Sequence, residues 1–249
     1  MNFDRQQWSL MGASVRGPAH IRAGVANQDA WHGRLLRNHG LIVVCDGLGS
    51  RTHSAYGARA GCRAVAAALQ RWQRSPQADP DLVLRLVHAL WNVQVAALGR
   101  DACATTCLFG AVLADGRIAL GRLGDGLAAV QSEAGFVELP ADDAAFGNMT
   151  TGLGIASDLR AWQIRVMPPP QCAVALMLAT DGVADDLLPE RRAPFLAHLI
   201  REHGRREPAR RGPALAAALR AWPTPRHLDD KTIAVMWNHE AQRQTGQEP

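Results

Sequence analysis

Aspartates stand at the ends of several apolar segments in this sequence. Asp46 follows "LIVVC", Asp181 follows "AVALMLAT", and Asp125 lies between glycines in "GRLGDG". Asp229 precedes the last apolar run, and Asp29 precedes a segment that could begin the first sheet. Carboxylates that are brought together repel one another unless a cation neutralises them. Because all these ligands are oxygens, the pattern predicts a site for a hard ion such as Mg²⁺ or Mn²⁺.

A plainer interpretation exists for each acid taken alone. Asp-Gly after a strand is common turn chemistry, which favours a turn over a ligand at any single position. Repetition of the pattern favours a shared site. Gly47 and Gly182 then have a use, because a ligating strand end must turn sharply and can offer a backbone carbonyl. Two metals held in this way could orient and deprotonate a bridging water for attack on a phosphoryl group.

The elements that must position these acids follow from the apolar pattern. Runs rich in Val, Ile and Leu predict strands over 41–46, 107–114, 117–123, 173–180 and 232–237. Asp115 and Gly116 separate two of these runs and predict a hairpin. Apolar spacings of three and four predict helices over 54–73, 79–99, 190–203 and 212–222. A helix pair between strands, with hairpins later, predicts an α+β fold with antiparallel sheets covered by helices.

The totals are those of an ordinary globular protein. The chain has 249 residues, a length that one domain can account for. No apolar run approaches the roughly 20 residues that span a bilayer, and the N-terminus lacks the basic and apolar segments of an export signal. We therefore expect a cytoplasmic protein without membrane contact. The last residues, 240–249, are expected to be a disordered tail.

Cysteines and basic residues give little sign of other sites. The five cysteines lie mostly in apolar stretches and lack the paired spacing of a zinc site, so buried free thiols are expected; they are Cys45, Cys62, Cys103, Cys107 and Cys172. The net charge is only +4. The strongest basic run, "REHGRREPARRGP", has no interleaved aromatics, so we expect a solvated loop between helices and no nucleic-acid surface.

Six segments, in this order along the chain, resemble those of the metal-dependent protein Ser/Thr phosphatases, the protein phosphatase 2C or PPM family. "NQDA", "VVCDGLGS" and "ATTCLFGAVL" are similar to the family's Asn-Glu-Asp, Val-x-Asp-Gly-hydrophobic-Gly and Gly-Thr-Thr segments. "GRLGDGLAAV", "LATDGVADDL" and "DDKTIAVMW" are similar to its Gly-Asp-Ser-Arg, Ser-Asp-Gly-hydrophobic and Asp-Asn-x-Thr segments. Each segment is weak alone, and their shared order makes the resemblance specific.

This resemblance implies a fold and a reaction. Residues 1–239 would form one PPM-type domain, a four-layer α/β/β/α sandwich of two antiparallel sheets flanked by antiparallel helix pairs. A short flap at about 140–165 would lie beside the site. The implied activity is Mg²⁺- or Mn²⁺-dependent hydrolysis of phosphoserine and phosphothreonine in proteins. Water activated by two metals would attack in line, without a phosphoenzyme.

The resemblance also implies roles for individual residues. Asp46 would bridge the two metals, with the Gly47 carbonyl as a further ligand. Asp181 and Asp229 would complete the shell of one ion, and with Asp46 they are the implied catalytic set. Asp29 would hold the other ion, directly or through water. Three more roles are implied: a looser third metal for Asp125, a contact to water for Thr106, and support of the ligands for Asp185.

The sequence departs from the family's pattern just upstream of Asp29. Gln28 replaces a glutamate that ligates metal in some members, and its amide adds no charge, so weaker binding of that ion is expected. The arginine that contacts substrate phosphate in many members would fall at Gly24. His20 and Arg22 are nearby substitutes, because Arg22 carries a planar fork and His20 could protonate the leaving alcohol. A surface arginine and a structural histidine are the plainer alternatives.

Other departures mark a divergent branch of the family. Gly-Asp-Gly-Leu stands for Gly-Asp-Ser-Arg, and Ala104 stands for a glycine. The Arg-rich, Lys-poor composition is typical of bacteria with GC-rich genomes. Bacterial members commonly oppose a Ser/Thr kinase, so the expected partner is a phosphorylated protein, either such a kinase or its targets.

Two alternative functions carry different signatures. Phosphatases of the haloacid-dehalogenase type form an aspartyl-phosphate and place a second Asp two residues after the first. Here that residue is Leu48, which argues against them. The other alternative is a catalytically weak pseudophosphatase that binds a phosphoprotein or a kinase, and the changes at Gln28 and Gly24 favour it.

Overall fold

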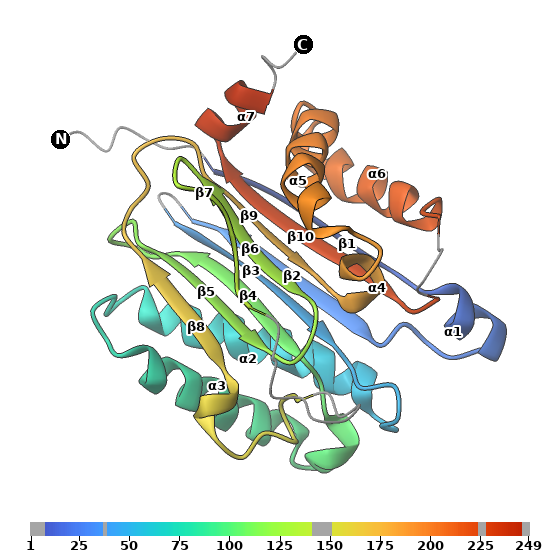
Figure 1. The fold of residues 1–249 in the computed structure, drawn as a ribbon. Helices are drawn as coiled ribbons and strands as arrows, with labels where there is room; N and C mark the ends of the chain where they lie inside the picture. The colour runs from blue at the N-terminus through green and yellow to red at the C-terminus, as the bar shows by residue number, and fades with distance from the viewer. Residues whose placement is uncertain (1–7, 37–38, 141–150, 224–227, 246–249) are drawn as a thin grey trace.

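Two five-stranded antiparallel sheets lie face to face in the computed structural model, which describes residues 8–36, 39–140, 151–223 and 228–245 (Figure 1). One sheet has the strand order β1-β10-β9-β6-β7, and the other has the order β2-β3-β4-β5-β8. The strands are β1 (Trp8–Val15), β2 (Asp29–Leu35), β3 (Gly40–Asp46), β4 (Cys107–Val112), β5 (Ile118–Leu123), β6 (Leu127–Ser132), β7 (Gly135–Glu138), β8 (Gln163–Met167), β9 (Ala175–Ala179) and β10 (Lys231–Asn238).

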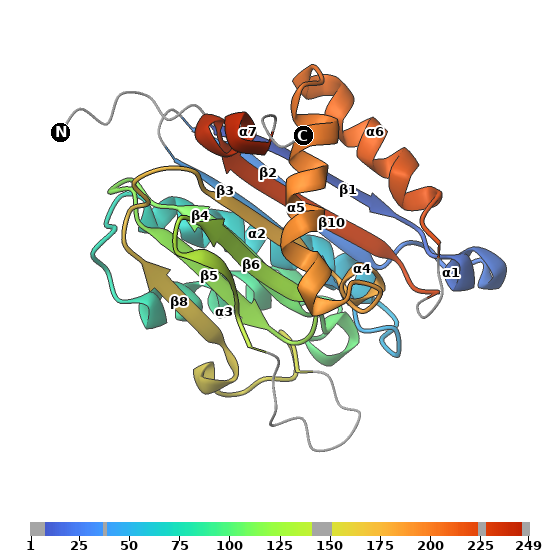
Figure 2. The ribbon, with the colours of Figure 1, turned by 45° about the horizontal axis from the view of Figure 1, so that its top comes forward.

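A pair of long helices covers the outer face of each sheet (Figure 2). Helices α2 (Ser54–Trp72) and α3 (Pro80–Val95) lie on the sheet that contains β3, and α5 (Pro189–Gly204) and α6 (Pro208–Arg220) lie on the sheet that contains β10. The short helices are α1 (Pro18–Ala23), α4 (Asp181–Ala184), α7 (His239–Thr245) and the 3-10 turns η1 (Asp101–Cys103) and η2 (Leu159–Ala161). The four-layer sandwich is thereby confirmed. Within the described ranges, no helix is both long and apolar enough to cross a bilayer.

Strand β3 explains why the sequence carries an unbroken apolar run before Asp46. Leu41 and Val43 pack in the layer under α2 and α3, whereas Ile42 and Val44 pack between the two sheets. Successive side chains of a strand point to opposite faces, and both faces of β3 are covered. Each fully buried aliphatic side chain contributes about 1.5–3 kcal/mol. The strand that carries Asp46 is therefore held from both sides.

The predicted strands and helices are all present, with ends that differ by a few residues. The hairpin at Asp115 and Gly116 joins β4 to β5 as predicted. Strands β1, β6, β7 and β8 were not predicted, and they complete the two sheets. Of the proposed flap at 140–165, residues 141–150 lie outside the described residues, and 151–165 contain η2 and the start of β8.

The expected solvated loop at 201–213 is wrong over most of its length. Helix α5 runs to Gly204 and α6 begins at Pro208, so the connection is only residues 205–207. The reason is Arg211, which is 9% exposed and donates to the carbonyls of Arg206 and Gly204 at 3.0 and 2.9 Å. Its guanidinium also lies 5.2 Å from the ring centre of Trp237.

Helix α7 contradicts the expected disorder for residues 240–245. The Asn238 side chain accepts a hydrogen bond from the backbone N–H of Ala241 at 3.0 Å, which caps the helix start. Gln242 accepts a hydrogen bond from the indole of Trp237 at 3.2 Å. Residues 246–249 lie outside the described residues. The four cysteines inside apolar stretches, Cys45, Cys62, Cys103 and Cys107, are buried free thiols, whereas Cys172 is exposed.

Helix α2 passes unusually close to η1. A Cβ atom added at Gly57 would lie 1.7 Å from the carbonyl oxygen of Cys103. The carbonyl of Gly57 also accepts a hydrogen bond from the Trp91 indole at 3.1 Å, which ties α2 to α3. Only glycine fits at this crossing, so Gly57 sets how closely the helix layer approaches the segment leading into β4.

We predict that Gly57→Ala lowers the free energy of unfolding by about 1–3 kcal/mol, because the added methyl overpacks this crossing. Urea denaturation measures the change. Gly204→Ala is the matched control, since its added Cβ would meet its nearest neighbours at 3.4 Å, an ordinary contact. Equal stability of the two variants would contradict the prediction.

Candidate metal centre

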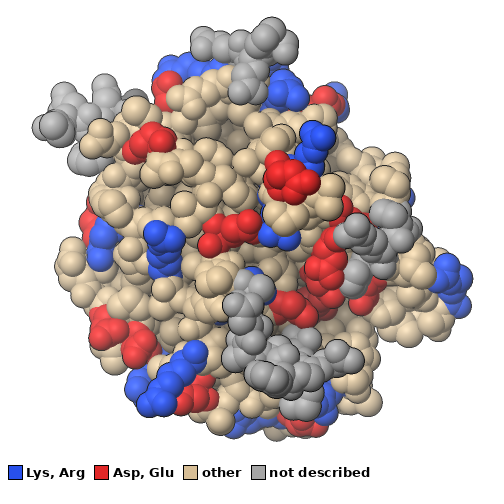
Figure 3. Space-filling view, viewed as in Figure 1, with Lys and Arg blue, Asp and Glu red and all other residues tan. Residues whose placement is uncertain are grey.

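The predicted acids meet at one edge of the sandwich because of how the strands run. Strands β3 and β9 end at this edge, where β2, β6 and β10 begin. Asp46 is the last residue of β3, Asp29 is the first residue of β2, and Asp181 follows β9. Asp125 and Asp229 precede β6 and β10. Ala179 pairs with both Ile233 and Leu127, which sets β9 between β10 and β6. Figure 3 shows acidic side chains gathered at the lower right of this face, where these strand ends lie in Figure 1.

A cavity of about 500 Å³ opens at this edge. Four of the predicted metal ligands line it: Asp46, Asp125, Asp181 and Asp229. Thr106 also lines it. The two sheets thus contribute to one hollow, since Asp46 belongs to the sheet of β3 and the other three acids flank strands of the sheet of β10. The cavity is large enough for several ions and waters.

Asp29 and Asp46 face each other directly across β2 and β3. Burial raises the pKa of Asp29 from its ordinary 3.8 to about 7, and the neighbouring polar side chains of Thr232, Asp46 and Thr180 oppose that shift. Burial also holds the pKa of Asp46 well above its usual range, and the nearby charges of Asp29 and Asp181 raise it further. Directly opposed like charges destabilise a strand pair. This pair therefore needs protons or a cation to lie where it does.

One oxygen of Asp29 is left without a partner. Its Oδ2 accepts a hydrogen bond from the Thr180 hydroxyl at 3.0 Å. Its Oδ1 is buried and has no hydrogen-bond partner among the described residues. A buried acceptor of this kind costs free energy unless it is satisfied. The oxygen-only donor set and this unpartnered atom together fit a hard divalent cation.

The backbone around Asp46 is tied to the start of β4. The Thr106 N–H donates to the Asp46 carbonyl at 2.7 Å, and the Thr106 hydroxyl accepts from the Asp46 N–H at 3.0 Å. The Thr105 hydroxyl also donates to the Asp46 carbonyl, at 2.8 Å. Three hydrogen bonds with two threonines thus hold the main chain of Asp46. The role of Thr106 in the structure is to position that residue at the cavity.

The glycines after Asp46 and Asp181 serve a purpose other than the sharp turn expected from sequence. Neither Gly47 nor Gly182 is among the described glycines with a positive φ. A Cβ at Gly47 would lie 2.6 Å from the backbone of Ser54, and one at Gly182 would lie 2.0 Å from the Asp230 carbonyl oxygen. Both glycines permit another segment to pass close by. This close packing draws α2 and the start of β10 toward the acids.

Asp125 does sit in a tight turn. Gly124 and Gly126, on either side of it, have φ values of 91° and 97°, a left-handed conformation that glycine adopts readily. The turn joins β5 to β6, and so carries the chain from one sheet to the other. The buried guanidinium of Arg122 donates to the Gly124 carbonyl at 2.8 Å and helps to hold this turn.

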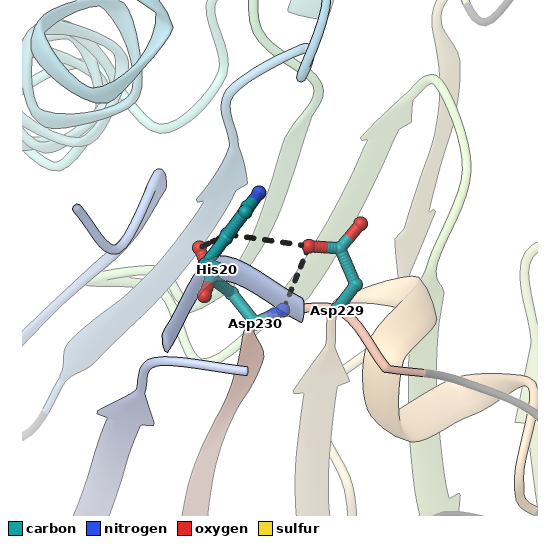
Figure 4. Close-up of side chains that lie close together, drawn as sticks. All are labelled: His20, Asp229 and Asp230. Atoms are coloured by element: carbon teal, nitrogen blue, oxygen red, sulfur yellow. Dashed lines mark hydrogen bonds and ion pairs between the residues drawn. The ribbon is translucent and has the colours of Figure 1, made fainter. Parts of the chain in front are cut away.

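Asp230 ties the N-terminal part of the chain to the start of β10. Its carboxylate accepts from the backbone N–H groups of Gly17 at 2.7 Å and Gln28 at 2.6 Å. Nδ1 of His20 lies 2.9 Å from Asp230 Oδ2 and 3.6 Å from Asp229 Oδ1 (Figure 4). These three side chains place potential ligand atoms within 4.8 Å of one another. Because backbone donors already occupy both Asp230 oxygens, we interpret the group as a structural clasp.

Lys231 is a buried cation close to the acids. Its ammonium donates to the Asp229 carbonyl at 3.2 Å, and its side chain lies in the core at the start of β10. Burial lowers the pKa of Lys231, while the charges of Asp186, Asp229 and other acids oppose that shift. Lys231 therefore holds the main chain of Asp229 in place beside the cavity.

Five predicted residues are not among the described residues that line the cavity: His20, Arg22, Asp29, Gly47 and Asp185. Asp29 and Gly47 nevertheless lie beside Asp46, as its partner across the strand pair and as the next residue in the chain. His20 and Arg22 belong to helix α1 rather than to a loop, and the Arg22 side chain is exposed. Gly24, at the position of the family's arginine, ends α1 with a φ of 68°. This is the left-handed cap that glycine favours. Asp185 is exposed at the end of α4.

The structure adds residues to the site that the sequence did not suggest. Thr180 contacts Asp29, and both Arg51 and Asp101 line the cavity. Thr180 stands next to Asp181 in "LATDGVADD", and Arg51 stands five residues after Asp46. Their closeness to predicted ligands along the chain was the signal available. The sequence offered no such signal for Asp101, because this residue reaches the site only through the packing of η1 against α2.

Comparisons with known proteins agree with this fold. The sequence pattern of the family described as Protein phosphatase 2C matches residues 16–222. A structure of a bacterial serine phosphatase has 14% identity and a TM-score of 0.64, covering 93% of this chain and 98% of that one. The PPM Ser-Thr phosphatase MsPP from Mycobacterium smegmatis, solved in complex with cacodylate, has 18% identity and a TM-score of 0.58, covering 92% of this chain and 97% of that one.

RsbX, solved in complex with magnesium, is a third similar structure. It has 11% identity and a TM-score of 0.58, and the match covers 96% of this chain and 98% of that one. Identities this low show a shared fold and nothing finer. Among curated proteins, no sequence matches this chain.

We predict that the metal-free protein loses stability as the pH rises from about 4 to about 7. The pKa of Asp29 is about 7 in the folded protein and near 3.8 when unfolded, so the folded state holds an extra proton in this window. Each retained proton changes stability by at most about 1.4 kcal/mol per pH unit. Urea midpoints in a chelating buffer measure the trend, and Asp29→Asn should flatten it. An equal slope in both proteins would refute the prediction.

Proposed function

We propose the function of this chain on the premise that it belongs to the protein phosphatase 2C family, whose pattern covers residues 16–222. The proposal is a divalent-metal-dependent phosphatase that hydrolyses phosphoserine and phosphothreonine in proteins. One observation supports it above the others: Asp46, Asp125, Asp181 and Asp229, from four separate segments, line a single cavity. The presence of these acids favours an enzyme over a pseudophosphatase that only binds its partner.

Mg²⁺ or Mn²⁺ fits this donor set. Asp46, with the Gly47 carbonyl, would contribute to both of two ions, and Asp181 and Asp229 would complete the shell of one of them. Asp29 would serve the other, and its unpartnered Oδ1 is the acceptor such an ion would satisfy. Asp125 would bind a third, looser ion. The magnesium in the similar RsbX structure supports this choice of metal.

Bound divalent ions would lower the pKa of a coordinated water and offset charge on the phosphoryl group. The chain's own part is to hold its carboxylates in place before substrate arrives. Thr105 and Thr106 hold Asp46, and Lys231 holds Asp229. Water would then add to phosphorus as the bond to the serine or threonine oxygen breaks. That oxygen takes up a proton and leaves as an alcohol, so no phosphoenzyme forms.

The change to Gln28 is compatible with this function. Its backbone N–H donates to Asp230, and its carbonyl accepts from Gly47 at 3.2 Å, so its main chain ties two parts of the site together. Its side-chain oxygen lies near Gly49, which lines the cavity. An amide there leaves one less negative charge for an ion, so we propose that a metal ion binds more weakly at that position.

We also propose that the substrate is a cytoplasmic phosphoprotein, either a kinase or the target of one.

We predict that the purified protein releases phosphate from phosphoserine peptides when Mn²⁺ is present. Asp46→Asn and Asp181→Asn should each lower kcat/KM by at least about 100-fold, because the ions supply several kcal/mol of charge stabilisation. Malachite-green detection of phosphate measures the rate. Glu190→Gln, at the exposed start of α5, is the control for loss of one acid and should keep full activity.

The same variants have a readout that does not depend on activity. Without metal, Asp46→Asn should be at least as stable as the wild type, because it removes one of two opposed carboxylates. Mn²⁺ should raise the melting temperature of the wild type and fail to raise that of the variant. A wild-type protein that binds Mn²⁺ and releases no phosphate from phosphopeptides would overturn the proposed function.

A further inference from the structure

The cavity lining holds one basic residue against five acids. Among the described residues that line it, Arg51 is the only lysine or arginine, and the acids are Asp46, Asp101, Asp125, Asp181 and Asp229. We infer that Arg51 binds the phosphoryl group of the substrate. This inference rests on the proposed function. Arg51 would allow a cavity that is otherwise lined by acids to bind an anionic phosphoryl group.

The charges in the cavity explain why such a residue is needed. Two divalent ions would supply four positive charges, against the five lining carboxylates and the carboxylate of Asp29 beside them. A phosphoryl group carries about −1.5 to −2 charge near neutral pH, and carboxylates left without an ion would repel it. The guanidinium of Arg51 adds a positive charge to this site. It also offers the planar fork of N–H donors that matches phosphate oxygens.

The main chain holds Arg51 at the cavity wall. Arg51 lies in the loop between β3 and α2, and its N–H donates to the Leu48 carbonyl at 2.9 Å. That loop is tied to the segment before β4, because Leu48 donates to Ala104 at 3.0 Å and His53 donates to Ala102 at 2.8 Å. The loop begins at Gly47, so Arg51 is positioned by the same turn that follows Asp46. A fixed anchor of this kind lowers the entropy cost of binding.

The guanidinium is only partly engaged. Its Nη1 lies 2.7 Å from Asp101 Oδ2, and that carboxylate is 74% exposed, so the pair is worth little by itself. Its Nε is buried and has no hydrogen-bond partner among the described residues. Asp101 orients one arm of the fork, while other donors remain for a second acceptor. A phosphoryl oxygen in the cavity is an acceptor of the required charge.

The residues that the sequence predicted to bind phosphate, His20 and Arg22, are placed less well for this role. Arg22 is exposed on α1 and is not among the described cavity-lining residues. His20 lies against Asp230 and Asp229. Since Gly24 caps α1, the position expected for the phosphate arginine is committed to a helix end. Arg51 reaches the cavity from a different segment.

The test compares Arg51→Ala and Arg51→Lys with the wild type, and uses Arg59→Ala, on the exposed face of α2, as the matched control. With saturating Mn²⁺, we measure kcat and KM for a phosphoserine peptide, and inhibition by inorganic phosphate. Arg51→Ala should raise KM and the inhibition constant of phosphate by about 10- to 100-fold. Arg51→Lys should recover part of the loss, because it keeps the charge and loses the fork. Mn²⁺ affinity and melting temperature should stay unchanged.

The outcomes separate this inference from the proposed function. An active wild type whose Arg51→Ala kinetics equal those of Arg59→Ala would overturn the inference and leave the phosphatase in place. A loss seen in Arg22→Ala but not in Arg51→Ala would also overturn it. An inactive wild type would overturn the proposed function. In that case, calorimetry measures the binding of inorganic phosphate in the presence of Mn²⁺. The inference about Arg51 is upheld if Arg51→Ala is the only variant that loses phosphate binding, and it is overturned if all variants bind phosphate equally.

Discussion

The position of Asp29 directly opposite Asp46 is the constraint on which the rest of the site depends. The strand register places two carboxylates opposite each other, in a setting where burial raises the pKa of both. Two ionised carboxylates in this position repel each other when no cation lies between them. The surrounding structure supplies hydrogen bonds from Thr180 and the main-chain ties of Thr106. Local stability is given up at this pair, as it commonly is at the functional sites of folded proteins.

The sequence was sufficient to predict which acids would meet and insufficient to predict what surrounds them. Asp46 and Asp181 end long apolar runs, and the alternation of strands and turns indicates which edge they share. Strand β6, with the sequence "LAAVQS", was missed because alanine has low strand propensity and one of its partners, β9, lies far along the chain. Asp101 enters the site through the packing of η1 against α2, which no local pattern encodes. The helical continuation through Arg211 was missed for the same reason, since its partner Trp237 lies in β10.

Glycine shows how a correct motif can be explained by an incorrect cause. Gly47 and Gly182 follow the two strand-end acids, and a sharp turn was the natural explanation. Neither residue has a positive φ, and both instead make room for a neighbouring backbone, at Ser54 and at Asp230. The consequence is wider than a turn. Two helices and a strand converge on the acids because no side chain keeps them apart, whereas Gly124 and Gly126 do supply the conformational freedom that Asp125 needs.

The contacts of Asp230 determine when the site can form during synthesis of the chain. Asp230 grips Gly17 and Gln28 from the other end of the chain, and β10 pairs along the whole of β1. A ribosome makes the N-terminal partner of each contact first and must synthesise some two hundred further residues before the second appears. Until then Asp229 is absent, and the sheet lacks the strand that joins β1 to β9. The growing polypeptide therefore carries no assembled centre before the segment that begins β10 has been made.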